Sequence, residues 1–519
     1  MALQTFSVPA VGGLDLVSAP QVLSQKPGAA LVLNNYEALA EGGYRRINGM
    51  VPYGDIPDVI SKEVIRGIAY YKGIVAVIGQ YVLHSPDGAT WNVVNKKNVS
   101  NTSSKGLTAL DLIPRMGTGP VEFTVINQGD VDVITITDDM DAPAELKVVG
   151  NSYTYTISDN ADVVGYRYST KYQDHVVYAG SRGKPGSIAV SSRFKPLDFT
   201  SAGAWVAQVS DEIVGLHTFR DYLYIFCRNS IYRVINLESQ KDVAIRPVTT
   251  KVGCIDGRSI QEIGGDILFL ADDGLRYLGA TERIDDVSLN LVSALVRPLI
   301  NSVAPNQGPV SSVVIPSKAQ YRLFFTTTLG KRIGLIGTLG ADGQFSWSTT
   351  DDMWVDALTM TTEGEGETVY HIGSPTTGNK RVYYHDRGNH FDTSEIKGTW
   401  AVPHFNMGDS AVRKTLHFLD AYLEAEDKAS IELTIKYDHE DPKVMQPEAF
   451  YLEPVVQAAR YGEAIYGQAT YGAIKFPLDD IFLEGSGKWM QLTFQDNDVD
   501  NSPYIIRGYD LQFTPSGRI

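Results

Sequence analysis

The sequence predicts an all-β protein in which a β-propeller of six to eight blades is followed by a C-terminal antiparallel β-sandwich. Three observations predict this fold class. Paired apolar strands recur at near-regular intervals, Gly and Tyr are abundant (48 and 28 of 519 residues), and the apolar pattern changes after about Glu395. Glycine suits tight turns and tyrosine suits strands. We expect an N-terminal arm and entry seam (1–64), a propeller (65–394) and a sandwich (395–519).

The recurring unit is a short apolar strand, a turn and a second strand. Successive units from His175 begin 47, 44, 55 and 47 residues apart, and a further pair of strands from Val121 fills the long gap after Gly73. Hairpins repeating at this period are typical of propeller blades, which bury one another's faces. The units begin at Gly73, Val121, His175, Tyr222, Asp266, Tyr321 and Thr368.

Two turns between these strands support the propeller. Residues 85–91 read SPDGATW and residues 342–347 read DGQFSW. The first resembles the Asp-box hairpin of sialidase-like propellers, although it is one residue short between Asp87 and Gly88. In those folds the box is a structural turn, in which Asp binds backbone amides and Trp fills the space between strands. We therefore expect a turn here and not a catalytic site.

One segment has a helical pattern. In residues 285–303, DDVSLNLVSALVRPLINSV, apolar residues recur at spacings of three and four. Pro298 is expected to end or kink this helix, because proline lacks the amide hydrogen. The segment is interpreted as a helix packed on the rim of a blade.

The C-terminal part has a different texture. Its strands alternate apolar and polar residues, which suits a sandwich with one solvated face. Between them, RYGEAIYGQATYGAI places Tyr461, Tyr466 and Tyr471 five residues apart, each before a Gly. This spacing matches neither helix nor strand, so we expect an extended loop. Its aromatic anchors would pack on their own sandwich or on a neighbouring chain.

The search for chemistry finds no strong motif. The nine histidines form no metal-ligand spacing, and nucleotide loops and nucleophile elbows are absent. Cys227 and Cys254 lie in apolar runs and are expected to be buried free thiols. DNDVDN at residues 496–501 imitates a calcium loop but has Asn501 where that loop needs Gly. We expect no enzymatic activity, no catalytic residue and no cofactor or metal, and a surface turn at 496–501 with an opportunistic cation as the alternative.

Charge and hydropathy argue against two further classes of protein. The chain carries 45 basic and 61 acidic residues, a net charge of −16. Tight, non-specific nucleic-acid binding needs clustered Lys and Arg, so this class is disfavoured. No apolar run is long enough to span a membrane, so we expect no membrane insertion by this chain.

The stretch YEALAEGGYRRINGM from Tyr36 is the best candidate for an assembly site. A phosphate loop needs glycines that lead into a helix, whereas Gly42 and Gly43 precede Tyr44, Arg45 and Arg46 in an extended pattern. Arginines adjacent in a strand project to opposite faces. We expect these five residues to form a structural or assembly seam, in which the arginines pair with carboxylates on two surfaces.

Several segments together resemble the tail-nozzle proteins of short-tailed bacteriophages, similar to tail tubular protein B and to packaged-DNA stabilisation proteins. The resemblance covers most of the chain and is carried by diffuse, structural motifs. These begin with GGLDLVSAPQVLSQKPGAALVLNNYEALAEGGYRRINGM at 12–50 and end with YIIRGYDLQFTPSGRI at 504–519. The others are residues 145–157, 175–199, 252–278 and 398–424.

The resemblance implies a structural protein of the virion tail, assembled in the host cytoplasm. Its expected form is a homo-hexameric ring beneath a tail adaptor ring, in contact with tail fibres or spikes. Double-stranded DNA would pass through the lumen without specific binding, and the ring would retain the packaged genome until ejection. Six acidic chains would repel DNA from the channel wall.

Two alternatives remain open. The Asp-box-like turn also fits a glycan-recognising or sialidase-like virion propeller. A tail component of a long-tailed phage would use the same fold, and composition does not distinguish it from a nozzle.

Overall fold

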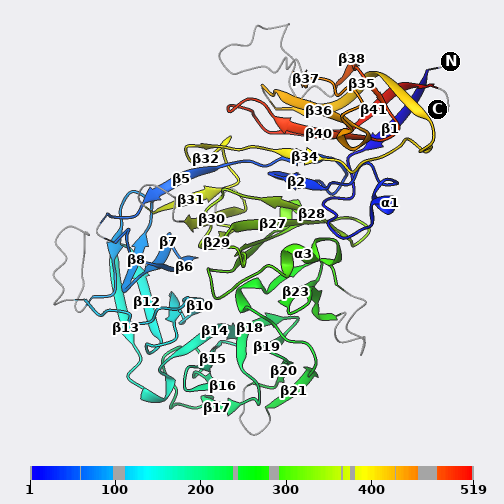
Figure 1. Cartoon of the computed structure of the whole chain (residues 1–519). Helices are drawn as coiled ribbons and strands as arrows, with labels where there is room; N and C mark the ends of the chain where they lie inside the picture. The colour runs from blue at the N-terminus through cyan, green and yellow to red at the C-terminus, as the bar shows by residue number, and fades with distance from the viewer. Residues whose placement is uncertain are drawn as a thin grey trace.

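The computed structural model describes residues 3–58, 60–96, 112–237, 243–279, 291–363, 366–373, 380–426, 428–453 and 476–516. Almost all regular structure in these residues is β-strand, which confirms the predicted all-β class. Figure 1 shows a ring of small sheets below and a separate two-layered body above, where the labelled N- and C-termini lie near one another.

The ring is a β-propeller. Six of its antiparallel units have four described strands, and the unit between the fourth and fifth of these has three, within the predicted range of six to eight blades. The first four units are β6 (Ile65–Tyr70), β7 (Ile74–Ile78), β8 (Tyr81–Ser85) and β9 (Asn92–Val93); β10 (Glu122–Asn127), β11 (Asp132–Thr137), β12 (Ala144–Val149) and β13 (Ser152–Ile157); β14 (Tyr166–Tyr172), β15 (His175–Ser181), β16 (Lys184–Val190) and β17 (Trp205–Gln208); β18 (Ile213–Phe219), β19 (Tyr222–Cys227), β20 (Ile231–Ile235) and β21 (Ala244–Thr249).

The remaining units complete the circle. The three-stranded unit is β22 (Gln261–Ile263), β23 (Asp266–Ala271) and β24 (Gly274–Tyr277), and the next is β25 (Ser311–Ile315), β26 (Gln320–Thr326), β27 (Arg332–Leu339) and β28 (Phe345–Thr350). The last is β29 (Ala357–Thr361), β30 (Thr368–Gly373), β31 (Arg381–His385) and β5 (Met50–Asp55). Because β5 pairs antiparallel with β31, a strand from before the first unit closes the ring.

The apolar runs in the sequence explain the blades. The middle strands β7, β15 and β23 are buried along nearly their whole length, since each blade face packs on a neighbouring blade. Two-residue turns join several first and second strands. Arg220 and Asp221, and likewise Gly264 and Gly265, all have positive φ, as the twist of a two-residue hairpin requires.

The upper body is a β-sandwich built from both ends of the chain. One layer is a seven-stranded sheet, and the other is the outer half of a nine-stranded sheet. Trp400 stacks on Phe494 between the layers, with ring centroids 4.9 Å apart. The seven-stranded sheet holds β1 (Gln4–Pro9), β3 (Tyr36–Ala38), β4 (Tyr44–Arg46), β35 (Arg413–Ala425), β38 (Phe476–Phe482), β39 (Ser486–Gly487) and β41 (Tyr504–Ser516). The other layer holds β2 (Val32–Asn34), β34 (Thr399–Ala401), β36 (Ile431–Tyr437), β37 (Phe450–Leu452) and β40 (Met490–Asp496).

Strand β2 joins the two bodies. It pairs parallel with the propeller strand β28 at Asn34 and Thr349, and antiparallel with β34 of the sandwich. One continuous sheet therefore runs from the propeller into the sandwich. The domain boundaries stay a prediction, but residues before 65 contribute strands to both bodies. Two short strands, β32 (His390–Phe391) and β33 (Ser394–Glu395), extend the last blade beside β5.

The described helices are short. The predicted helix at 285–303 is wrong for residues 291–303, where the chain forms the 3-10 turn η3 (Ala294–Val296) and the single-turn helix α3 (Arg297–Ile300). Residues 285–290 lie outside the described ranges. Pro298 lies in the first turn of α3, where a backbone amide has no hydrogen-bond partner within the helix, so the missing amide hydrogen of proline does not weaken the helix. Pro298 therefore lies at the start of a helix and does not end one. The others are α1 (Pro20–Leu23), η1 (Ala161–Val163), η2 (Gly257–Ser259), η4 (Pro316–Lys318) and η5 (Asp438–Glu440).

Candidate functional site

The predicted seam lies at the turn between β3 and β4. Gly42 and Gly43 have φ of +91° and +101°, which favours glycine, and the Leu39 amide donates to the Gly43 carbonyl at 3.0 Å. The next three residues form strand β4, not a helix. This geometry reverses the chain and offers no helix N-terminus to a phosphate.

Tyr44 anchors this turn in the core. Its side chain is fully buried, and its hydroxyl donates to the Gly28 carbonyl at 2.8 Å and accepts from the Gly13 amide at 2.9 Å. Its ring meets Trp400 edge-on, 5.0 Å between centroids. One phenol thus ties two N-terminal loops to the sandwich core.

Arg45 and Arg46 pair with carboxylates on different sides of β4. Arg45 contacts Glu37 at 3.1 Å and Glu426 at 2.8 Å. Arg46 is fully buried and donates through Nε to Asp496 at 2.6 Å. Their role in assembly stays a prediction.

Asp496 belongs to the stretch that imitates a calcium loop. Besides Arg46, its carboxylate accepts from the Gly398 amide at 3.1 Å and from the Tyr504 hydroxyl, which itself lies 2.5 Å from the hydroxyl of Tyr36. Asp498 pairs with Lys428 and accepts from the Asp500 amide. Within the described ranges, no group of three or more His, Cys, Asp or Glu side chains is placed to hold a metal.

A larger buried network surrounds Glu37 and was not foreseen from the sequence. Glu37 is 1% exposed and binds Lys318 at 2.9 Å and Arg322 at 2.9 Å in addition to Arg45. Lys318 and Arg322 also contact Asp386. Burial raises the pKa of Asp386, but these two cations outweigh burial and hold that pKa well below its usual value. The network ties β3 to two propeller blades.

Two histidines extend this network inward. Arg322 Nη1 lies 2.8 Å from His385 Nε2, and the Nδ1 atoms of His385 and His371 are 3.3 Å apart. Burial lowers the pKa of His371 to about 3, and burial together with Arg322 lowers that of His385 well below its usual value. Both rings are therefore neutral at physiological pH.

The remaining sequence candidates are simpler. Tyr461, Tyr466 and Tyr471 lie outside the described residues. In the turn at 85–91, Asp87 accepts from the Ala89 and Thr90 amides at 3.0 and 2.8 Å, and Trp91 is buried. Cys227 and Cys254 are buried free thiols, and burial raises the pKa of each to about 12. These turn and thiol predictions are confirmed.

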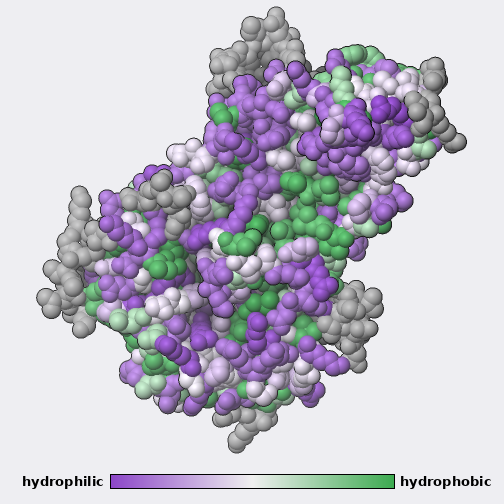
Figure 2. Space-filling model, viewed as in Figure 1, coloured by the Kyte–Doolittle hydropathy of each residue, from purple (hydrophilic) through white to green (hydrophobic). Residues whose placement is uncertain are grey.

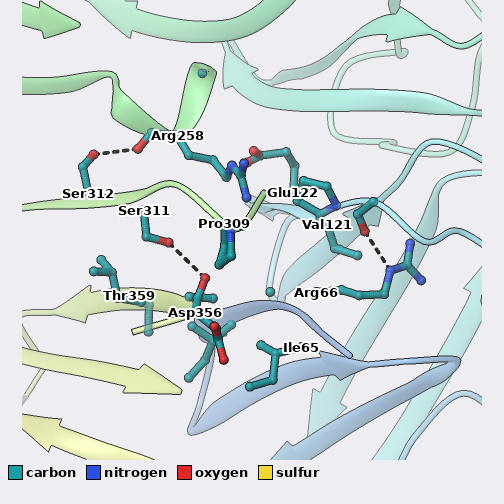
Figure 3. Close-up of a pocket in the computed structure, with 18 of the residues that line it drawn as sticks. Ile65, Arg66, Val121, Glu122, Arg258, Pro309, Ser311, Ser312, Asp356 and Thr359 are labelled. Carbon is teal, nitrogen blue, oxygen red and sulfur yellow. Dashed lines mark hydrogen bonds between the residues drawn. The ribbon is translucent and has the colours of Figure 1, made fainter. Parts of the chain in front are cut away.

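A cavity of about 810 Å³ lies at the centre of the propeller, among the first strands of several blades (Figure 3). Its wall includes Glu122 of β10, His217 of β18 and Arg258 of η2. In Figure 3 the side chains of Arg258 and Glu122 point toward one another. No pattern in the sequence indicates this grouping, because the three residues lie far apart along the chain, in and near different blades.

Most charges in the cavity wall are fixed by partners. Asp256 binds Arg258 through both carboxylate oxygens, at 3.0 and 2.6 Å. The hydroxyl of Ser312 donates to the Arg258 carbonyl at 2.6 Å, and Arg332 pairs with Asp356. These contacts hold the guanidinium groups in place.

Two groups of the wall are not fixed in this way. Among the described residues, the buried Nε2 of His217 has no hydrogen-bond partner. The Glu122 carboxylate faces the positive charge of Arg258. Desolvation raises the pKa of Glu122 to about 7, against the opposing effect of Arg258, and lowers that of His217 to about 4.

Comparisons with solved structures find distant likenesses. No family model and no curated protein matches the chain. An exo-β-1,3-galactanase from Phanerochaete chrysosporium has 11% identity over 98% of this chain and 100% of its own, with a TM-score of 0.26. The Pan2 WD40 domain of Neurospora crassa has 12% identity over 67% of this chain and 97% of its own, with a TM-score of 0.35. A chain of the mitotic checkpoint complex has 10% identity over 65% and 91%, with a TM-score of 0.37.

The described helices include none that is long and apolar enough to cross a membrane. Hydrophilic side chains dominate the face seen in Figure 2, with separate hydrophobic patches between them. The chain is a propeller joined to a sandwich.

Proposed function

We propose that this chain is a structural protein of a bacteriophage tail, which forms a homo-hexameric nozzle ring at the distal end of the DNA channel. The observation that carries the proposal is where the resembling segments lie. Residues 12–50, 398–424 and 504–519 supply β2, β3, β4, β34, β41 and most of β35, the strands that build the sandwich and join it to the propeller.

The architecture suits a part that transmits mechanical force. A continuous sheet through β2 and the buried charges around Glu37 couple propeller and sandwich, and the Arg46–Asp496 pair joins the two layers of the sandwich. Such coupling lets a force on one body reach the other without a flexible linker. The acidic chain, with a net charge of −16, favours a channel wall along which DNA slides without binding.

In this proposal the chain is not an enzyme. The ring sits beneath an adaptor ring, contacts fibres or spikes, retains the packaged genome and passes it during ejection. Assembly takes place in the host cytoplasm, and the mature ring belongs to the virion tail.

Mass photometry and electron microscopy of the purified chain test the proposal. A hexamer of 56.9 kDa chains has a mass of about 341 kDa and six-fold symmetry. Antibody labelling of virions should mark the distal tail. A chain that stays monomeric at high concentration and labels no part of the tail would contradict the nozzle.

A further inference from the structure

The central cavity of the propeller has no part in the proposed ring. At about 810 Å³ it falls within the range of small-molecule sites, roughly 300–1,000 Å³. Its lining runs from buried Ser311 and Ser312 to exposed Lys62 and Gln307, so it opens to solvent. The cavity is formed by one chain, and an inference from it does not depend on ring assembly.

The wall holds polar groups that are free to meet a ligand. His217 Nε2 has no hydrogen-bond partner among the described residues, and the Glu122 carboxylate faces Arg258 at the wall of the cavity. Arg258 uses Nε and Nη2 on Asp256, which leaves Nη1 outside that pair. Buried polar groups in native proteins are nearly always satisfied, so these groups call for a bound molecule or water.

The charge pattern selects the class of molecule. Arg258, Arg332 and Arg66 are neutralised by Asp256, Asp356 and Asp138 respectively. An anion entering the cavity would meet the carboxylate of Glu122, which already faces Arg258. A cation would meet Lys62 and Lys380, which also line the wall. A neutral molecule that both donates and accepts hydrogen bonds avoids both repulsions.

The wall also offers apolar surface beside these polar groups. Phe123 lies so close to Gly67 that a Cβ there would stand 2.8 Å from its ring, and Leu216 and Ile260 line the same cavity. Sugars present hydroxyls at their edges and C–H groups on their faces, which matches a wall of this mixed character. Near neutral pH, Glu122 with a pKa of about 7 is able to donate as well as accept.

We propose that the central cavity of the propeller binds a short neutral saccharide, with sugar hydroxyls hydrogen-bonded to Glu122, His217 and Arg258 Nη1. Such a site would let the chain recognise surface glycans, a role separate from forming a channel.

An array of neutral and acidic glycans, probed with the purified full chain, tests the proposal. Hits are then titrated by isothermal calorimetry, with inorganic phosphate and putrescine as anionic and cationic comparison ligands. We expect binding of at least one neutral glycan, weakened at least tenfold by Glu122→Ala. The matched control Asp130→Ala removes an exposed carboxylate of the same blade and should leave affinity unchanged.

A second wall variant guards against misfolding. If Glu122→Ala is insoluble, Thr359→Val, which alters the opposite wall on β29, should weaken binding several-fold while preserving the circular dichroism spectrum. The proposal is overturned if no neutral glycan binds, if only phosphate, putrescine or acidic glycans bind, or if the wall variants bind as tightly as the Asp130→Ala control.

Discussion

Replacing Arg46 with alanine should destabilise the protein far more than replacing its neighbour Arg45. Arg46 is 0% exposed and Asp496, its partner at 2.6 Å, is 2% exposed, so the variant leaves a buried carboxylate without its cation. Removing one partner of a buried pair costs about 3–5 kcal/mol. Arg45 is 15% exposed, and Glu37 keeps Lys318 and Arg322 when Arg45 is lost, so we expect about 1 kcal/mol there.

Urea denaturation followed by tryptophan fluorescence measures both variants, because Trp400 lies in the same core as Tyr504, which hydrogen-bonds to Asp496. A third variant, Arg46→Met with Asp496→Leu, removes both charges and should recover part of the loss, though Tyr504 and the Gly398 amide then lose their acceptor. A loss of less than about 1 kcal/mol for Arg46→Ala, or one no larger than that for Arg45→Ala, would show that the Arg46–Asp496 pair does not stabilise the fold as expected.

Three further predictions concern other parts of the chain. Wild-type protein should lose unfolding free energy between pH 7.5 and 5.5, because the pKa of His371 is depressed in the folded state and stays near 6.5 in the unfolded state. In His371→Asn this loss should be smaller by about 1.4 kcal/mol. Equal slopes of unfolding free energy against pH in the two proteins would contradict this. Tyr44→Phe should cost about 1–3 kcal/mol by leaving the buried Gly13 amide and Gly28 carbonyl unpaired, with exposed Tyr451→Phe as a neutral control in the same assay. Asp87→Ala should cost about 1 kcal/mol through loss of its amide contacts and leave glycan-array binding unchanged; abolished binding would instead mark the turn as functional.

The sequence was informative where structure is local. Apolar runs such as residues 74–78 and 266–271 identified the blades because each hairpin pairs strands only a few residues apart. The turn at Asp87 could be predicted because the amides that donate to its carboxylate belong to residues two and three positions later. The helix at 285–303 misled because apolar spacing alone does not distinguish a helix from a packed irregular segment containing proline.

Long-range pairing was beyond the sequence. Glu37 lies 281 residues from Lys318 and 285 from Arg322, and no spacing rule links them. Likewise β2 pairs with β28, more than 300 residues later in the chain. The sequence predicts that the N-terminal segment packs on a blade, but it does not predict that this segment connects the propeller to the sandwich. The cavity around Glu122 needed the ring closed before its residues met.

Ring closure by β5 has a consequence for synthesis of the chain. Strand β5 ends at Asp55, while its partner β31 begins at Arg381. At ~5–20 residues per second, a ribosome needs roughly 15–65 s to make the intervening segment. During that time β5 has an unpaired edge that is prone to aggregate. Strand β1 stays unpaired for longer, because its partner β41 lies near the end of the described chain. The nascent chain therefore spends most of its synthesis with an incomplete last blade, a window in which a holding chaperone would have most to protect.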